Sequence, residues 1–198
     1  RIISGGHLRN SVLDLLLANT RTPDERKGDL RAQLASNDLG ARRLCALVDR
    51  FGPEQHKTFV DDNIRYSEDL MRAGISKLQQ GTFEAQDFLE GDGLTEEDIR
   101  IAVKLDIHDK GLSLDFTGTD TQRPGNVNTP YPVALSAVYF AVKCVAGPKV
   151  PPNHGCYLPI HVKIPLGCLL NPRRPAAVSS GNVETSQRVA DVVFGALA

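Results

Sequence analysis

The sequence predicts an α+β fold, a long helical hairpin followed by a mainly antiparallel β-sheet with covering helices. Apolar residues recur with helical spacing through the first 81 residues, and strict alternation with a period of two begins after Gly81. We therefore divide the chain into a helical part, residues 1–81, and a mixed α/β part, residues 82–198. A sheet needs helices to cover it, so this division separates elements of one domain.

A capping signature marks the start of the first long helix. Thr22 is a typical N-cap residue, Pro23 suits the first helical position, and Glu25 completes a capping box. Apolar residues then recur at i, i+3, i+4 and i+7 as far as Phe51. A shorter helix precedes this one and ends near Asn19.

A second long helix follows at once. Gly52 ends the first helix and Pro53 opens the next, which stops at Gly81. Its apolar stripe consists of Val60, Ile64, Met71, Ile75 and Leu78. Two long helices joined by so short a connection predict an antiparallel hairpin.

Four strands are predicted in the mixed part. Residues 99–107 alternate strictly between apolar and other side chains, residues 112–116 do the same, and the turn Asp109-Lys110-Gly111 joins them into a hairpin. Residues 82–88 and 160–164 form the other two strands. Helices are expected at residues 132–145 and from Ser186 onward, and these would cover the sheet.

Size and composition are those of a globular protein. The 198 residues are 41% hydrophobic and 24% charged, and the net charge of −1 excludes a strongly basic nucleic-acid-binding surface. No stretch approaches the roughly 18 apolar residues of a membrane helix. The chain starts at Arg1 and stops within the apolar run Val189–Leu197, so we expect a segment of a longer protein.

The cysteines indicate a reducing compartment. No CxxC pair and no zinc-type spacing of cysteine and histidine occurs, which is typical of free thiols in a cytoplasmic protein. The pair His154 and Cys156 supplies two ligands, too few for a metal site, so we interpret this segment as a turn. We predict no metal site within these residues. The cysteines are Cys45, Cys144, Cys156 and Cys168.

The common nucleotide and catalytic motifs are missing from the chain. It contains no GxxxxGK[ST], GxGxxG, HExxH or GxSxG sequence. The segment by itself is therefore not predicted to be a P-loop ATPase, a Rossmann enzyme, a zincin or an α/β-hydrolase.

A first cluster of polar residues runs from Asp115 to Asn128. Asp115 lies near the end of a predicted strand and is the candidate general base. Asn126 and Asn128 are candidates to line a substrate site or an intersubunit face. The alternative is that these side chains satisfy backbone groups in a long loop.

A second cluster, Ser179–Arg188, leads into the last predicted helix. Glu184 is its only carboxylate, so it is the second candidate base or else the ion-pair partner of Arg188. The side chains of Asn182, Gln187 and Arg188 could hold a carbonyl, carboxylate or phosphate group, or face another subunit. The alternative is ordinary capping by Thr185 or Ser186.

Several runs together resemble the hydantoinase B / 5-oxoprolinase family. They keep the order of the family and extend over nearly the whole chain. The runs are Thr22–Gln33, Asp115–Thr119, Gly125–Asn128, Leu169–Pro172, Pro175–Val178 and, most specifically, Gly181–Arg188. Cys168 stands where a small residue such as serine is more usual.

The resemblance implies a role in a larger, cytoplasmic hetero-oligomer. Family members are similar to the B-type subunits of ATP-dependent N-methylhydantoinases, to the C-terminal half of 5-oxoprolinase, and to the large subunits of acetone and acetophenone carboxylases. A hydantoinase A-like subunit or domain binds ATP and Mg²⁺ and phosphorylates a carbonyl oxygen, and the B-type part acts on the activated species. The N-terminal portion of the family, which holds a divalent metal in the carboxylases, is not in this sequence.

The family therefore implies hydrolysis of a small cyclic amide, by ring opening of hydantoin or 5-oxoproline. The net charge and the lack of a long apolar stretch predict neither nucleic acid nor membrane as partner. This segment alone is expected to be inactive. One alternative is a subunit of an ATP-dependent ketone carboxylase. Another is a non-catalytic scaffold that docks the ATP-binding subunit.

Overall fold

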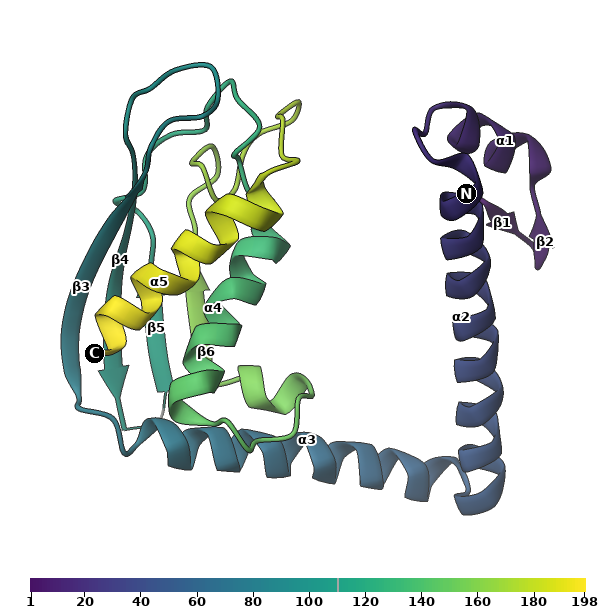
Figure 1. The fold of residues 1–198 in the computed structure, drawn as a ribbon. Helices are drawn as coiled ribbons and strands as arrows, with labels where there is room; N and C mark the ends of the chain where they lie inside the picture. The colour runs from purple at the N-terminus through teal and green to yellow at the C-terminus, as the bar shows by residue number, and fades with distance from the viewer. Residues whose placement is uncertain (110) are drawn as a thin grey trace. The chain divides into compact units, whose positions relative to one another are not determined.

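The computed structural model describes residues 1–109 and 111–198 and is drawn in Figure 1. It divides into two compact units, Arg1–Val60 and Asp61–Ala198. The division lies inside helix α3 (Pro53–Ile75), upstream of the change of period at Gly81. The second half of α3 belongs with the sheet because its residues Met71 and Ile75 are part of the hydrophobic core there.

The first unit contains two short strands, β1 (Ile3–Ser4) and β2 (His7–Leu8), which pair antiparallel. Helix α1 (Asn10–Ala18) and helix α2 (Pro23–Phe51) follow. The predicted helix ends are confirmed at both helices. The two strands were not predicted, because two residues are too few to show a period.

The capping box predicted at the start of α2 is wrong. Helix α2 begins at Pro23, but the side chain of Thr22 makes no capping hydrogen bond. Asp24 and Glu25 in the first turn still favour this end through the helix dipole. Gly52, with φ of 79°, separates α2 from α3 as predicted, and the antiparallel packing of the two helices stays a prediction.

The second unit is built on a four-stranded sheet in the described part of the chain, with the order β3-β4-β5-β6. Its strands are β3 (Gly81–Leu89), β4 (Ile99–His108), β5 (Gly111–Asp115) and β6 (Ile160–Lys163). The first three run antiparallel, as predicted, and β6 runs parallel to β5. The chain between β5 and β6 includes a long helix, which returns it to the same end of the sheet. Of the predicted turn between β4 and β5, Lys110 lies outside the described residues.

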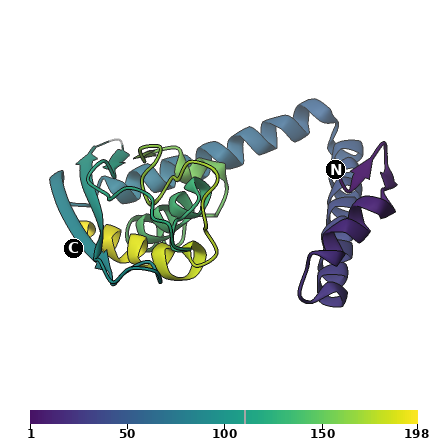
Figure 2. The same ribbon diagram turned by 90° about the horizontal axis from the view of Figure 1, so that it is seen from above.

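Two helices cover one face of this sheet, α4 (Tyr131–Ala146) and α5 (Ser186–Leu197), and both views show them on the same side (Figure 1, Figure 2). The alternation in β4 fits this arrangement, since Ile101, Val103 and Leu105 are buried in the core beneath the helices. Arg100 and Lys104 point to the other, outer face and are exposed. The α+β fold is thus confirmed.

None of the helices in the described residues combines the length and the apolar character that crossing a bilayer requires. The four cysteines, all of them described, are free thiols; Cys45 and Cys144 are exposed, and Cys156 and Cys168 are buried.

Candidate functional site

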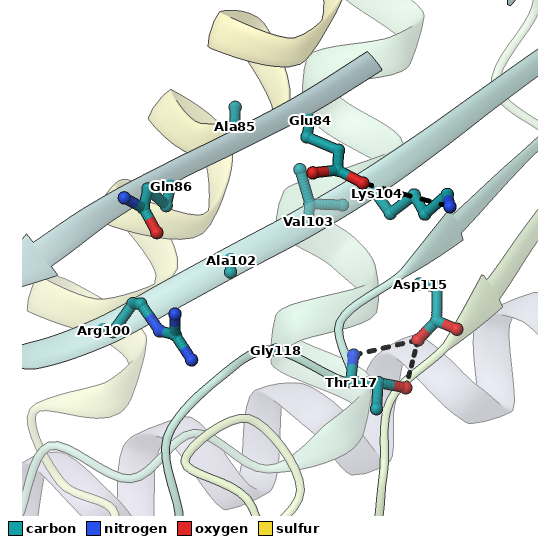
Figure 3. A pocket seen from close by; sticks show the side chains of 10 residues that line it. All are labelled: Glu84, Ala85, Gln86, Arg100, Ala102, Val103, Lys104, Asp115, Thr117 and Gly118. Atoms are coloured by element: carbon teal, nitrogen blue, oxygen red, sulfur yellow. Dashed lines mark hydrogen bonds and ion pairs between the residues drawn. The ribbon is translucent and has the colours of Figure 1, made fainter. Parts of the chain in front are cut away.

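The outer face of the sheet carries a hollow of about 580 Å³. Figure 3 shows it between β3, β4 and the loop that follows β5. Its lining is mostly polar and charged, with Glu84, Gln86, Arg100, Lys104, Asp115 and Thr117 around it. The predicted base Asp115 therefore lies in a cavity with two cationic side chains, which is the setting a polar or anionic reactant requires.

The hollow lies where β4 extends past the end of β5: Asp115, the last residue of β5, is opposite Lys104, and residues 99–103 of β4 have no partner in β5. The loop after Asp115 hydrogen-bonds to this part of β4 through a side chain. Thr119 Oγ1 accepts from Ala102 N at 3.2 Å and donates to Ala102 O at 3.1 Å. Gly118 lies directly over Ala102, and a Cβ atom on this glycine would be 3.2 Å from the Ala102 methyl group. Two residues with almost no side chain thus leave the space open.

Charges alternate across the outer face. In register, Glu84 of β3 is next to Lys104 of β4, Lys104 is next to Asp115 of β5, and Asp115 is next to Lys163 of β6. Lys163 Nζ is 2.9 Å from Asp115 Oδ2, and Lys104 Nζ is 3.9 Å from Glu84 Oε1. Arg100 makes no ion pair with any described residue, so its charge is available to a ligand.

Asp115 is held on both carboxylate oxygens. Its Oδ1 accepts from the backbone N–H of Thr117 at 2.9 Å and from the Thr117 hydroxyl, and its Oδ2 accepts from Lys163. Burial raises the pKa of Asp115, but the hydrogen bonds from Lys163 and Thr117 outweigh it, and the pKa is lowered. The group is therefore ionised at neutral pH, as a base must be, although the same hydrogen bonds weaken its proton affinity.

The structure brings the two predicted polar clusters together. Ser180 N donates to Asn126 O at 3.0 Å, and Asn126 Nδ2 donates to Ser179 Oγ at 3.1 Å. Thr129 Oγ1 donates to Gly181 O at 3.1 Å. Further along the same two loops, the Thr185 hydroxyl donates to Val127 O. The loops at 125–129 and 177–185 thus form one hydrogen-bonded unit, which we call the paired loops.

Asn128 holds the paired loops from inside. It is fully buried, its Nδ2 donates to Arg123 O, Gly125 O and Ala177 O at 2.8–3.0 Å, and its Oδ1 accepts from Arg123 N at 2.8 Å. Its amide is therefore occupied by the protein, and the prediction that Asn128 lines a substrate site is corrected to a structural role. Asn126, by contrast, is exposed.

The alternative role of Glu184, as the ion-pair partner of Arg188, is wrong, because Arg188 pairs elsewhere. Arg188 Nη1 lies 2.7 Å from Asp87 Oδ2 on β3. Hydrogen bonds from Phe88 N and from Arg188 lower the pKa of Asp87. Glu184 is exposed on the turn before α5. The sequence could not show this pairing, because Asp87 and Arg188 are 101 residues apart.

The entry into α5 is a π-helical turn, Gly181–Thr185, and not a capped helix start. The Ser186 N–H donates to Gly181 O, and the Ser186 hydroxyl donates to Asn182 O at 2.9 Å. Neither Thr185 nor Ser186 makes a side-chain cap, so the capping alternative is wrong. π-helical turns of this kind occur frequently at functional sites.

Asn182 and Gln187 line a second hollow, of about 340 Å³, between α4 and the start of α5. We call it the helix groove. Its apolar lining comes from Val133, Ala137, Phe140 and Ala190. The helices lie on the inner face of the sheet, whereas Asp115 is on the outer face, so the predicted site residues occupy two separate places.

Asp92, in the loop between β3 and β4, is a residue that the sequence analysis did not single out. It is buried, and its carboxylate accepts from Leu94 N and Thr95 N at 2.9 and 2.8 Å and from Gly125 N at 2.8 Å. These hydrogen bonds lower its pKa to about 2. The hydrogen bonds from Leu94 N and Thr95 N could have been predicted, because an aspartate in a turn commonly accepts from N–H groups two or three residues further along the chain. The bond to Gly125 had no signal in the sequence.

No cluster of three or more His, Cys, Asp or Glu side chains suited to a metal ion occurs among the described residues. His154 starts a short 3₁₀ helix, His154–Tyr157, and Cys156 is buried with its Sγ donating to Asn153 O. Asn153 caps this turn by accepting from Gly155 N. The segment is a turn, as interpreted.

Comparison with known proteins assigns the family. The sequence profile of the family described as Hydantoinase B/oxoprolinase matches residues 1–198. The chain belongs to the hydantoinase B/oxoprolinase family. A putative B-type subunit of a D-/L-hydantoinase from Pseudomonas sp. (strain NS671) is 31% identical over 214 residues, covering 100% of this chain and 35% of that relative. The resemblance stated from the motifs is thus confirmed.

Two solved structures share the fold of this hydantoinase B-type chain. The ATP-dependent caprolactamase from Pseudomonas jessenii superposes with a TM-score of 0.87 at 29% identity, covering 99% of this chain and 34% of that one. An acetone carboxylase superposes with a TM-score of 0.87 over 100% of this chain and 28% of that one, and its 16% identity shows the fold alone. The chain spans about a third of the length of most of these proteins.

Proposed function

We propose that this chain is part of the B-type subunit or domain of an ATP-dependent cyclic-amide hydrolase that opens hydantoin- or 5-oxoproline-like rings. The observation that carries the proposal is the likeness, at 29% identity over 99% of the chain, to an enzyme named as an ATP-dependent caprolactamase. A lactam is a cyclic amide, and the family description joins hydantoinase B with oxoprolinase, whose names also point to cyclic amides.

The proposal divides the chemistry between two proteins or domains. This chain has no nucleotide-binding motif, and its hydantoinase relative is named as a B-type subunit, so we assign ATP and Mg²⁺ to an A-type partner. Phosphorylation of the amide oxygen makes the ring carbon more electrophilic, so water can add to it. The C–N bond then breaks as the nitrogen takes a proton, which opens the ring, and a second water hydrolyses the resulting acyl phosphate to a carboxylate and phosphate. Following the family resemblance, we assign any divalent metal to the N-terminal portion of the family, outside this chain.

Within the chain, we assign the proton-accepting carboxylate to Asp115, with Glu184 as the second candidate. Support for Asp115 comes from its position in the outer hollow and from a lowered pKa that keeps it ionised at neutral pH. Asn126 and Arg188 are assigned to an intersubunit face beside the paired loops. The four free cysteines, of which Cys45 and Cys144 are exposed, fit the reducing conditions of the cytoplasm.

The test uses the full-length gene product together with the ATP-binding protein that copurifies with it. ATP hydrolysis is measured with hydantoin, 5-oxoproline, and acetone plus bicarbonate. We expect ATP hydrolysis to depend on a cyclic amide and to be accompanied by the ring-opened product. Dependence on the ketone and bicarbonate instead would establish the carboxylase alternative. A protein that binds the partner but never alters its ATP turnover would be a scaffold.

A further inference from the structure

One cationic side chain of the outer hollow has no counter-charge. Lys163 Nζ is 2.9 Å from Asp115 Oδ2, and this lysine is therefore paired. Lys104 Nζ is 3.9 Å from Glu84 Oε1. Arg100 has no such partner in the part of the chain that the structure describes. Beyond its ion pairs the hollow thus carries one spare positive charge, which matches a ligand group with a single negative charge.

The spare charge lies at the end of the hollow away from Asp115, as Figure 3 shows. Arg100 is four residues before Lys104 on β4, and Lys104 is the register partner of Asp115. At a rise of about 3.3 Å per residue, these two positions are about 13 Å apart along the strand. A group held by Arg100 is therefore remote from the atoms on which Asp115 would act.

The charges also fix which way round an anionic ligand lies. Glu84 and Asp115, the two carboxylates that line the hollow, are both register neighbours of Lys104. Like charges repel, so an anionic group is disfavoured at that end and favoured beside Arg100. A phosphoryl group on the reacting amide oxygen would lie near Asp115. The group that Arg100 holds is therefore a different one, an anionic substituent of the substrate itself.

The middle of the hollow has room for a small ring between these two ends. Ala102 and Gly118 leave it open, and its volume of about 580 Å³ is within the usual range for ligand sites, about 300–1,000 Å³. Gln86 is the register partner of Ala102 on β3, and its carboxamide has no hydrogen-bond partner among the described residues. That carboxamide offers a donor and an acceptor to the ring.

The chemistry of Arg100 favours a carboxylate. A planar guanidinium presents parallel N–H donors that match the two oxygens of a carboxylate. The backbone of this residue is fixed on both sides, since Arg100 N donates to Asp120 Oδ2 and Asp120 N donates to Arg100 O, each at 3.0 Å. The side chain thus starts from a rigid position on the sheet and has its donors free.

We propose that Arg100 binds a carboxylate that the substrate carries away from its reacting amide, so that the outer hollow selects anionic rings over neutral ones. Arg100 is then the residue that determines specificity, at the same site as Asp115. The reacting amide and the action of Asp115 rest on the proposed function. The single negative charge and its place at the Arg100 end rest on the hollow itself.

Three molecules with one ring test the proposal: 5-oxoproline, its neutral carboxamide 5-oxoprolinamide, and 2-pyrrolidinone. Only the first carries a carboxylate. Affinities for the full-length protein with its copurified partner are measured without ATP by ligand-observed NMR titration. We expect 5-oxoproline to bind at least about tenfold more tightly than either neutral ring, the effect of a hydrogen bond to a charged group. Equal affinities for the three molecules would overturn the proposal.

Variants assign this preference to Arg100 and separate it from any carboxylate site on the partner. Arg100→Gln should reduce the preference for 5-oxoproline over 5-oxoprolinamide to less than about twofold. Arg100→Lys, which keeps the charge without the planar donors, should retain part of it. Arg43→Gln, at an exposed arginine of α2, is the matched control and should retain all of it. An unchanged preference in Arg100→Gln would overturn the assignment.

The fold of these variants is checked by thermal unfolding. The Arg100 side chain is exposed and makes no contact to another described side chain that its loss would break, so both variants should unfold at the wild-type temperature. With ATP and the partner present, Arg100→Gln should raise the KM for 5-oxoproline about tenfold. A rise of the same size in the KM for hydantoin, which has no carboxylate, would contradict a carboxylate contact.

The two proposals fail in different ways. If ring amides stimulate ATP hydrolysis but Arg100→Gln changes neither KM, the hydrolase function stands and the carboxylate site fails. If no ring amide stimulates ATP hydrolysis while Arg100→Gln still abolishes the preference for 5-oxoproline, the carboxylate site stands and the hydrolase function fails.

Discussion

The backbone N–H of Gly125 donates a hydrogen bond of 2.8 Å to Asp92 Oδ2, across 33 residues of sequence. The backbones of the two residues also approach closely, because a Cβ atom on Gly125 would lie 2.0 Å from the Asp92 carbonyl oxygen. A buried carboxylate thereby joins the loop after β3 to the paired loops that carry Asn126 and Asn182. The position of these candidate site residues depends on this connection.

Asp92→Asn should lower stability and change its pH dependence. The folded-state pKa of Asp92, about 2, is below its ordinary value of 3.8, so this group stabilises the fold above about pH 4. That contribution disappears as the pH falls from about 4 toward 2. We therefore expect a lower Tm at neutral pH and a shallower loss of Tm in acid, measured by thermal unfolding from pH 7 to pH 2.

The control for this prediction is Glu96→Gln, at an exposed carboxylate in the same loop. It should leave both the Tm and its acid branch close to those of the wild type. If the Asp92 variant followed the wild-type curve throughout, the carboxylate would contribute nothing to folding.

Gly181→Ala should separate the paired loops. A Cβ atom at this position would lie 2.1 Å from the carbonyl oxygen of Asn128, and backbone cannot move aside as a flexible side chain can. We expect a loss of about 1–3 kcal/mol in the free energy of unfolding, measured with urea. Gly28→Ala, in the interior of α2 with open space around its Cα, should instead stabilise the protein by about 0.5–1 kcal/mol. Similar values for both variants would contradict this account.

Asn128→Ala and Asn126→Ala should differ sharply although they are two residues apart. Asn128 is buried and bonded to four backbone groups among the described residues, so its removal leaves polar groups unpaired in the interior. We expect a loss of about 2–4 kcal/mol for Asn128→Ala and a change within about 0.5 kcal/mol for Asn126→Ala. Chemical denaturation of the two variants measures this difference. Equal losses would mean that Asn128 is not the residue that holds the loops.

Asp115→Ala, made in the assembled enzyme, should cut turnover at least about tenfold, because a general base typically contributes about 10²–10⁴-fold. Glu184→Ala should do the same only if Glu184 is the acting carboxylate, so the pair of variants decides between them. Steady-state turnover with a cyclic amide and ATP is the measurement. Wild-type turnover in both variants would remove the catalytic assignment from this chain.

Lys163→Met should shift the acid limb of the turnover profile to higher pH. Lys163 helps to lower the pKa of Asp115, so its removal raises that pKa and protonates the carboxylate at a higher pH. A pH–rate profile of the assembled enzyme measures the shift. Lys149→Met, at an exposed lysine after α4, is the control and should leave the profile in place. An unshifted limb in Lys163→Met would mean that Asp115 does not titrate in the reaction.

Most of the secondary structure, and the family, were predicted from the residues alone, whereas β1, β2 and the π-helical turn Gly181–Thr185 were not. Helix ends at Pro23 and Gly52, the alternation of β4 and the hairpin with β5 were all predicted, since each depends on the period of neighbouring residues along the backbone. The motif runs taken together, most specifically Gly181–Arg188, identified the family without any structure.

Tertiary structure alone decided which polar groups meet. In the folded chain β6 runs parallel to β5, Arg188 pairs with Asp87, and backbone groups of the protein hydrogen-bond to the side-chain amide of Asn128. It also put Asp115 and Gln187 on opposite faces of the sheet. Local propensity carries no information about such partners, because a carboxylate or an amide bonds to whichever group the packed core brings within about 3 Å, however distant in sequence.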